Sequence, residues 1–216
     1  MDKMYILFDL DGTITDPKVG ITKSVQFSLQ HFGITVADAD TLTHFIGPPL
    51  RDSYKRCYGF DDEKTEQAVA KYREYFSTHG IYENALYEGM DNLLNTLHAR
   101  GKQLIVATSK PTVYAKQILQ HFNIAQYFAF VAGSELDGRR SKKSEIITYA
   151  FAEMGITSPE KAVMIGDREH DVIGANETGL ESVGVLYGYG DLQELTDAGA
   201  TYIAATVVDL HELLCD

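Results

Sequence analysis

The chain has 216 residues, 44% of them hydrophobic, which suffices for one large domain or for a domain with a smaller insertion. Its 31 acidic and 19 basic side chains leave a formal net charge of -12, which argues against nucleic-acid binding because such a surface repels a phosphate backbone. The two cysteines have no metal or redox spacing, and the N-terminus has no signal-peptide features. No apolar run approaches the roughly 20 residues of a membrane span. These features predict a cytoplasmic protein with no membrane partner.

The first predicted strand is the apolar run that opens residues 5–13, YILFDLDGT, and it leads into Asp9 and Asp11. Asp-Gly is a common hairpin dipeptide, and a hairpin would require a second alternating strand after it. The chain instead continues with apolar residues at helical spacing: Ile21, Val25, Leu29 and Phe32. A helix is therefore expected here, and the two acids need an explanation other than a turn.

A segment of about seventy residues without a convincing strand separates the first strand from the next, far more than an ordinary crossover. Its clearest helical stretch is KTEQAVAKYREYF at 64–76, and the prolines of IGPPL at 46–50 predict a break between helices. We expect residues 16–84 to form a mostly helical cap domain. Residues 1–15 and 85–216 then form the core.

From residue 85 onward, short apolar runs alternate with amphipathic stretches. The predicted strands of this part are QLIVAT from Gln103, YFAFVAG from Tyr127, AVMIGD from Ala162, ESVGV from Glu181 and TYIAA from Thr201. With the first strand they make about six, a normal number for an open sheet. The sequence thus predicts an α/β fold in which helices cover both faces of a mostly parallel sheet.

Polar residues follow the predicted strands at the edge where ligands bind in such sheets. The first strand delivers Asp9 and Asp11, and the second delivers Thr108, Ser109 and Lys110. The loop after the third delivers Lys142 and Lys143 directly before a helix, and the fourth delivers Asp167 and, four residues on, Asp171.

Four carboxylates are expected to converge at this edge: Asp9, Asp11, Asp167 and Asp171. At an effective dielectric near 20, two like charges about 4 Å apart repel by roughly 4 kcal/mol, so the cluster requires a cation or protonation of some groups. An all-oxygen ligand set favours Mg²⁺, which leaves positions for water and phosphate oxygens.

These residue types suit phosphoryl transfer. Asp9 can attack phosphorus and form an aspartyl phosphate, while Asp11 can protonate the leaving oxygen and then deprotonate the attacking water. Thr108 can bind phosphoryl oxygens, and a lysine can neutralise the developing charge. Taken alone, Thr108 could equally cap the next helix, and Lys143 could be a solvated helix start.

Four features of the chain resemble, in order and spacing, the four motifs of the haloacid dehalogenase superfamily. They are DLDGT, the strand ending at Thr108, the lysine before a helix, and GDREHD. The helical insertion is similar to the cap of the phosphoglycolate phosphatase-like branch. The resemblance implies a Rossmann-like three-layer core, a mobile cap and Mg²⁺-dependent chemistry. By position, Asp9 resembles the nucleophile, Asp11 the acid/base with a metal contact through its backbone carbonyl, Thr108 the phosphate-binding hydroxyl and Asp167 a metal ligand.

The third motif departs from the Lys-Pro-x-Pro of many relatives, because this chain has SKKSE. The catalytic lysine is therefore Lys142 or Lys143, and we favour Lys143 because it abuts the helix start at Ser144. Asp171 either ligates the metal directly or contacts and orients the residues that ligate it.

The sequence thus predicts a Mg²⁺-dependent phosphatase that hydrolyses a small phosphomonoester, phosphoglycolate-like or a nucleoside monophosphate. The same residues also suit a phosphomutase of the β-phosphoglucomutase type, an inorganic pyrophosphatase or a non-catalytic phosphometabolite sensor. Its partner is expected to be a small phosphorylated metabolite, and the protein a monomer or homodimer. Candidate substrate contacts in the cap are the basic residues Lys23, His44, Arg51 and Lys55.

Overall fold

The computed structural model describes residues 1–215 and divides the chain into two compact units. One consists of Met1–Asp16 and Leu86–Asp216, and we call it the core unit; the other is Pro17–Ala85, which we call the inserted unit. Two short strands, β2 (Thr15–Asp16) and β3 (Ala85–Leu86), lie where the chain passes from one unit to the other. No helix in the described part of the chain combines the length and the apolar character needed to cross a bilayer.

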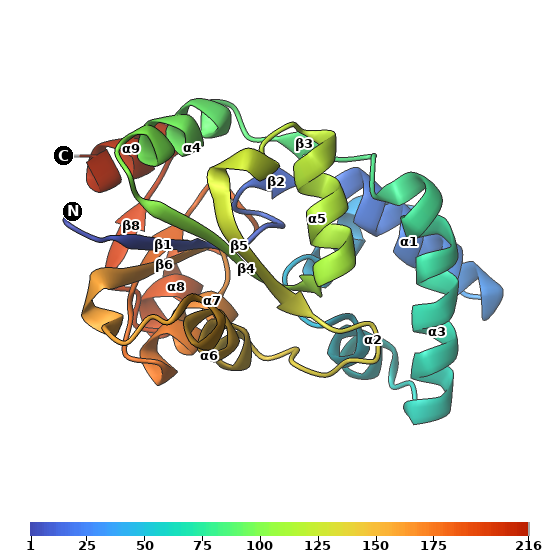
Figure 1. Ribbon diagram of the computed structural model, residues 1–216. Helices are drawn as coiled ribbons and strands as arrows, with labels where there is room; N and C mark the ends of the chain where they lie inside the picture. The colour runs from blue at the N-terminus through green and yellow to red at the C-terminus, as the bar shows by residue number, and fades with distance from the viewer. Residues whose placement is uncertain (216) are drawn as a thin grey trace. The chain divides into compact units, whose positions relative to one another are not determined.

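A six-stranded sheet forms the centre of the core unit (Figure 1). All its strand pairs are parallel, and the order is β5-β4-β1-β6-β7-β8. The strands are β1 (Tyr5–Phe8), β4 (Gln103–Pro111), β5 (Phe128–Ser134), β6 (Ala162–Gly166), β7 (Glu181–Val185) and β8 (Tyr202–Ala204). The predicted α/β fold with a parallel sheet of about six strands is confirmed.

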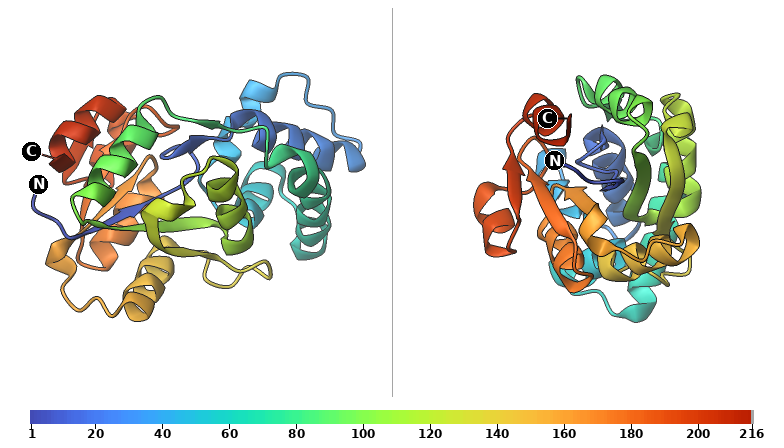
Figure 2. Two further views of the ribbon diagram at one scale, coloured as in Figure 1. Left: turned by 45° about the horizontal axis from the view of Figure 1, so that its top comes forward. Right: turned by 60° about the vertical axis from the view of Figure 1, so that its left-hand side comes forward.

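Helices cover both faces of this sheet (Figures 1 and 2). One face carries α4 (Met90–Ala99), α5 (Thr112–His121) and α9 (Val207–Cys215), and the other carries α6 (Lys143–Met154) and α7 (Glu169–Glu177). The shorter helical segments are η3 (Ala125–Tyr127), η4 (Pro159–Lys161) and α8 (Leu192–Asp197). Strand β1 is buried on both faces, which explains its unbroken apolar sequence.

The register aligns the end of β1 with the end of β6 and with the second half of β4, which extends further, to Pro111. Phe8 at the end of β1 lies beside Val106 of β4 and Ile165 of β6. The next residue, Asp9, donates its backbone N–H to the Ile165 carbonyl at 2.9 Å. The residues that follow β1 and β6 therefore meet the last residues of β4 at one edge of the sheet.

Side-chain alternation decides which face Asp9 occupies. Leu7, two residues earlier, packs in the apolar cluster between the sheet and helices α6 and α7, together with Ile146, Ile147 and Ala175. Because side chains alternate along a strand, Asp9 points to the same side. It therefore approaches the N-terminal ends of α6 and α7, where Lys143 is the first residue of α6 and Asp171 lies in the first turn of α7.

The inserted unit is helical, and the predicted helical insertion between β1 and β4 is confirmed. Its elements are α1 (Lys18–His31), η1 (Ala39–Phe45), α2 (Leu50–Tyr58), α3 (Asp62–Tyr75) and the π-helical turn η2 (Phe76–Gly80). The Asp61 side chain accepts the Lys64 N–H at 2.8 Å and caps the start of α3. An aromatic cluster fills the interior of the unit: Phe32, Phe45, Tyr54, Tyr58 and Phe60.

Candidate active site

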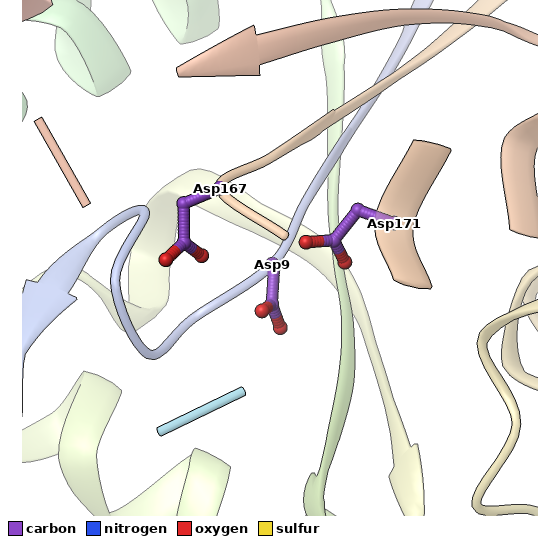
Figure 3. Close-up of side chains that lie close together, drawn as sticks. All are labelled: Asp9, Asp167 and Asp171. Carbon is purple, nitrogen blue, oxygen red and sulfur yellow. The ribbon is translucent and has the colours of Figure 1, made fainter. Parts of the chain in front are cut away.

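The aspartates predicted to converge all lie buried at the carboxyl edge of the sheet in the core unit: Asp9, Asp11, Asp167 and Asp171. Three of them, Asp9, Asp167 and Asp171, can each offer a carboxylate oxygen within 4.8 Å of the others (Figure 3). Asp9 and Asp167 stand on the connections after β1 and β6, and Asp171 projects from α7 (Figure 3). The carboxylate of Asp11 lies outside this group of three.

One backbone and one side-chain hydrogen bond hold the Asp167 carboxylate. Its Oδ2 accepts the Tyr189 N–H at 2.8 Å, and its Oδ1 accepts the Thr13 hydroxyl at 3.2 Å. Gly12 adopts a φ of 88°, and a Cβ there would lie 2.2 Å from Oδ2 of Asp167. The Asp-Gly dipeptide of the first motif thus lets the loop run directly against a buried carboxylate.

Lys143 is the cation at the centre of the cluster. Its Nζ lies 3.0 Å from Oδ1 of Asp9 and 2.7 Å from Oδ1 of Asp171, and it donates to the Ala107 carbonyl at 2.8 Å. Lys143 is buried and is the first residue of α6, whereas Lys142 is its exposed N-cap residue. Lys143 is therefore the lysine that the fold brings to the aspartates.

Asp171 contacts both its own helix and the cluster. Its Oδ2 accepts the Arg168 N–H at 3.1 Å, which satisfies a backbone donor at the start of α7. Its Oδ1 faces Lys143. Helix α7 is held in turn by Glu194, which accepts from Arg168 Nε at 2.8 Å and from the Glu169 N–H at 2.9 Å.

A second buried ion pair involves Asp11. Its Oδ2 pairs with Nζ of Lys110, and both side chains are buried. Thr108, also buried, lies two residues before Lys110, and its hydroxyl accepts the Lys110 N–H at 3.3 Å. The structure therefore provides each of the two aspartates of the first motif with its own lysine.

The electrostatics of the cluster reflect burial first and mutual repulsion second. Burial raises the pKa of Asp167 well above its usual range, and the neighbouring carboxylates of Asp171 and Asp9 raise it further. Burial also raises the pKa of Asp171 to about 6, although Lys143 opposes this change. Burial alone would lower the pKa of Lys143, but Asp171 and Asp9 outweigh it and the pKa is raised, so the lysine is a permanent cation.

These buried groups fit a divalent cation. Four carboxylates face two lysines, which leaves a formal charge of about -2 when all six groups are ionised. Among the described residues, Oδ1 of Asp9 and Oδ1 of Asp171 contact the same ammonium, that of Lys143, and the buried Oδ1 of Asp11 accepts no hydrogen bond. Buried carboxylate oxygens that share too few positive charges are the groups that a hard cation would stabilise.

The sequence reasoning placed Lys110 at a strand end but assigned it no role. The signal was available, because Thr108 and Lys110 are two residues apart and the strand period places both on one side. The Tyr189 N–H and the Glu194 carboxylate carry no comparable signal, since their positions depend on how β6, β7 and α8 pack. Thr13 follows the acids directly, yet a hydroxyl next to a turn is too common to indicate a contact with Asp167.

The basic residues proposed as substrate contacts in the inserted unit mostly have acidic partners within that unit. Lys23 pairs with Glu83 at 2.5 Å, Arg51 with Glu66 at 2.5 Å and Lys55 with Asp62 at 2.6 Å, whereas His44 lies in η1 against the ring of Phe45.

Comparisons with known proteins extend over nearly the whole chain. A family model described as haloacid dehalogenase-like hydrolase matches residues 6–185. A 5'-nucleotidase of Pseudomonas aeruginosa is 46% identical over 209 residues, which cover 97% of this chain and 94% of that protein. The tyrosine-protein kinase PtkA of Mycobacterium tuberculosis is 40% identical over 211 residues, which cover 97% of this chain and 72% of that protein. The crystal structure of a predicted phosphatase from Clostridium acetobutylicum is similar with a TM-score of 0.96 at 50% identity and covers 98% of both chains.

Proposed function

Because the chain belongs to the haloacid dehalogenase-like hydrolase family and is a phosphomonoester hydrolase, we propose that it is a Mg²⁺-dependent phosphatase that acts on nucleoside monophosphates through an aspartyl phosphate on Asp9. The observation that carries the proposal is the buried cluster of Asp9, Asp167 and Asp171 with Lys143 between two of its carboxylates. The similarity to a 5'-nucleotidase supports the substrate class.

Four residues share the chemistry in this proposal. An Asp9 oxygen attacks phosphorus and the bond to the leaving oxygen breaks, while Asp11 donates a proton to that oxygen. Asp11 then takes a proton from the water that attacks phosphorus, which releases inorganic phosphate and restores Asp9. The Thr108 hydroxyl binds a phosphoryl oxygen, and Lys143 offsets the negative charge that develops beside Asp9.

The proposed Mg²⁺ site consists of the carboxylates of Asp9, Asp167 and Asp171 with the backbone carbonyl of Asp11. When bound, the cation supplies positive charge that reduces the repulsion between an attacking carboxylate and an anionic phosphate. Magnesium is preferred because every ligand is an oxygen and the site must leave room for phosphate oxygens.

We also propose that residues 17–85 act as the cap that selects the substrate. Phosphoglycolate has a carboxylate besides its phosphate and would require a second cation. Three of the candidate cations in this unit, Lys23, Arg51 and Lys55, already pair with carboxylates, so this recognition would require breaking an ion pair. A nucleoside carries no second anionic group, which favours nucleoside monophosphates.

The test measures phosphate release with Mg²⁺ and with EDTA from a panel of nucleoside 5'-monophosphates, phosphoglycolate, a hexose phosphate and pyrophosphate. We expect nucleoside monophosphates to have the highest kcat/KM, and EDTA to abolish turnover. An isomerised hexose phosphate without released phosphate would indicate a mutase, and preferred cleavage of pyrophosphate would indicate a pyrophosphatase. If the protein released phosphate from no compound of the panel, the phosphatase proposal would fail and the non-catalytic phosphometabolite sensor would be favoured.

Asp9→Asn tests the nucleophile. We expect turnover to fall by more than about 10³-fold while the fold is kept, because the asparagine amide cannot replace the carboxylate as the nucleophile that forms the acyl phosphate. Asp2→Asn is the matched control, since Asp2 is exposed and far from the site in the fold. Activity retained in Asp9→Asn would remove Asp9 from this role.

A further inference from the structure

Lys110 is a buried cation that the proposed mechanism does not use. Its side chain is 6% exposed and that of Asp11 is 10% exposed, so water contributes little to stabilising either charge. A buried lysine is stable only with a partner, and Oδ2 of Asp11 provides one. This pair is separate from the contacts of Lys143 with Asp9 and Asp171.

The backbone around Lys110 is fixed by its neighbours. The pairing of β4 with β5 loses its regular register between Thr108 and Pro111, so Lys110 leaves the ladder and its N–H bonds to the Thr108 hydroxyl instead. The Ser134 hydroxyl donates to the Ser109 carbonyl at 2.8 Å. A Cβ on Gly133 would lie 2.5 Å from the Lys110 carbonyl, which shows how closely β5 packs against this segment.

The two oxygens of Asp11 differ. Oδ2 pairs with Lys110, whereas Oδ1 is buried and accepts no well-directed hydrogen bond from the described residues. A carboxylate held through one oxygen keeps a defined orientation, and its other oxygen remains available for proton transfer. Without the lysine, the same buried carboxylate would lose the cation in contact with it and the bond that fixes its orientation.

We propose that Lys110 is a positioning residue for Asp11, which it holds through Oδ2 so that Oδ1 exchanges the proton with the leaving oxygen and then with water. The proposal rests on the acid/base role given to Asp11 in the proposed function. Lys110 itself transfers no proton.

Leaving-group chemistry separates this role from a purely structural one. An alkoxide is a poor leaving group and requires a proton during bond cleavage, whereas p-nitrophenolate leaves without one. General acid catalysis typically contributes 10²–10⁴-fold where it is needed. A misplaced Asp11 should therefore slow alkyl phosphomonoesters much more than p-nitrophenyl phosphate, whereas a general distortion of the site should slow both equally.

The experiment uses the full chain with Mg²⁺ and measures kcat and KM for p-nitrophenyl phosphate and for the best alkyl phosphomonoester of the panel. For Lys110→Met we expect kcat on the alkyl substrate to fall by at least about 10-fold more than kcat on p-nitrophenyl phosphate, with KM changed less than about threefold. Lys110→Arg should restore part of the alkyl activity. Lys116→Met, an exposed lysine on α5, is the control and should match the unaltered protein.

Equal losses on both substrates, or a rise in KM with kcat unchanged, would overturn the positioning role. If Lys110→Met does not fold, Lys110→Gln keeps a polar side chain and should show the same substrate split. Asp11→Asn separates the two proposals. If it shows the split and the Lys110 variants do not, only the inference on Lys110 fails; if it shows no split, the acid/base role of Asp11 fails.

Discussion

Replacing Lys143 by methionine should destabilise the protein strongly when no divalent cation is present. The Lys143 ammonium lies 3.0 Å from Oδ1 of Asp9 and 2.7 Å from Oδ1 of Asp171. At an effective dielectric near 20, each contact is worth about 5 to 6 kcal/mol before desolvation is counted. Methionine removes this attraction and leaves two buried carboxylates facing each other.

Protonation limits the loss. Protonating a carboxylate of ordinary pKa at pH 7 costs about 4 kcal/mol. If the repulsion between the two buried carboxylates exceeds this cost, one of them takes up a proton in the variant protein. Removal of the lysine also removes the desolvation penalty of its own charge. The free energy of unfolding should therefore fall by about 3 to 5 kcal/mol, as is typical when one partner of a buried ion pair is removed.

The assay is urea denaturation in EDTA at pH 7, with Lys142→Met as the matched control. Lys142 is exposed, and its replacement should change the free energy of unfolding by less than about 0.5 kcal/mol. Excess Mg²⁺ should recover part of the loss in Lys143→Met, because the cation takes over the charge compensation. Equal stabilities of the two variants in EDTA would refute the view that Lys143 neutralises the cluster.

Two further predictions concern the carboxylates. Because the pKa of Asp171 is raised to about 6, this carboxyl binds a proton more tightly in the folded protein than in the unfolded chain, and in EDTA its contribution to the free energy of unfolding should fall by roughly 2 kcal/mol from pH 4 to pH 7. Urea titrations should show a smaller fall in excess Mg²⁺ and in Asp171→Asn, and an unchanged fall in both would contradict this assignment. Gly12→Ala should lose about 2 kcal/mol or more, together with Mg²⁺-dependent activity, because its Cβ would meet Oδ2 of Asp167 at 2.2 Å. Gly33→Ala, at a φ of 73° with nothing within 4 Å of the added Cβ, should lose about 1 kcal/mol and keep its activity; identical behaviour of the two alanine variants would exclude the collision.

Local sequence determined the strands of the core unit. Apolar runs with short polar ends predicted the six strands of the parallel sheet, most clearly its central strands, because a strand covered on both faces by helices is apolar along its length. In the inserted unit, helical spacing predicted α1 and α3, whereas η1, α2 and the π-helical turn Phe76–Gly80 were not identified individually. The residue types after the strands also indicated phosphoryl transfer before any contact was known.

Helical periodicity in α6 distinguishes Lys143 from Lys142. Lys143, Ile146, Ile147 and Ala150 follow the helical spacing i, i+3, i+4 and i+7, and all four are buried. Lys142 lies off this face. The buried stripe of the helix therefore contained the information, but only once the first helical residue was known.

The sequence by itself determined which side chains stand at strand ends, because a strand and its period are local properties of the chain. Only the tertiary structure decided which of those side chains meet. Asp9 lies near Asp167 because β1 pairs with β6. Asp11 meets Lys110 because β1 also pairs with β4, whose register with β5 breaks after Thr108. Pairings between segments about 100 to 160 residues apart depend on how the whole sheet assembles, and no local pattern of residues encodes the order of its strands.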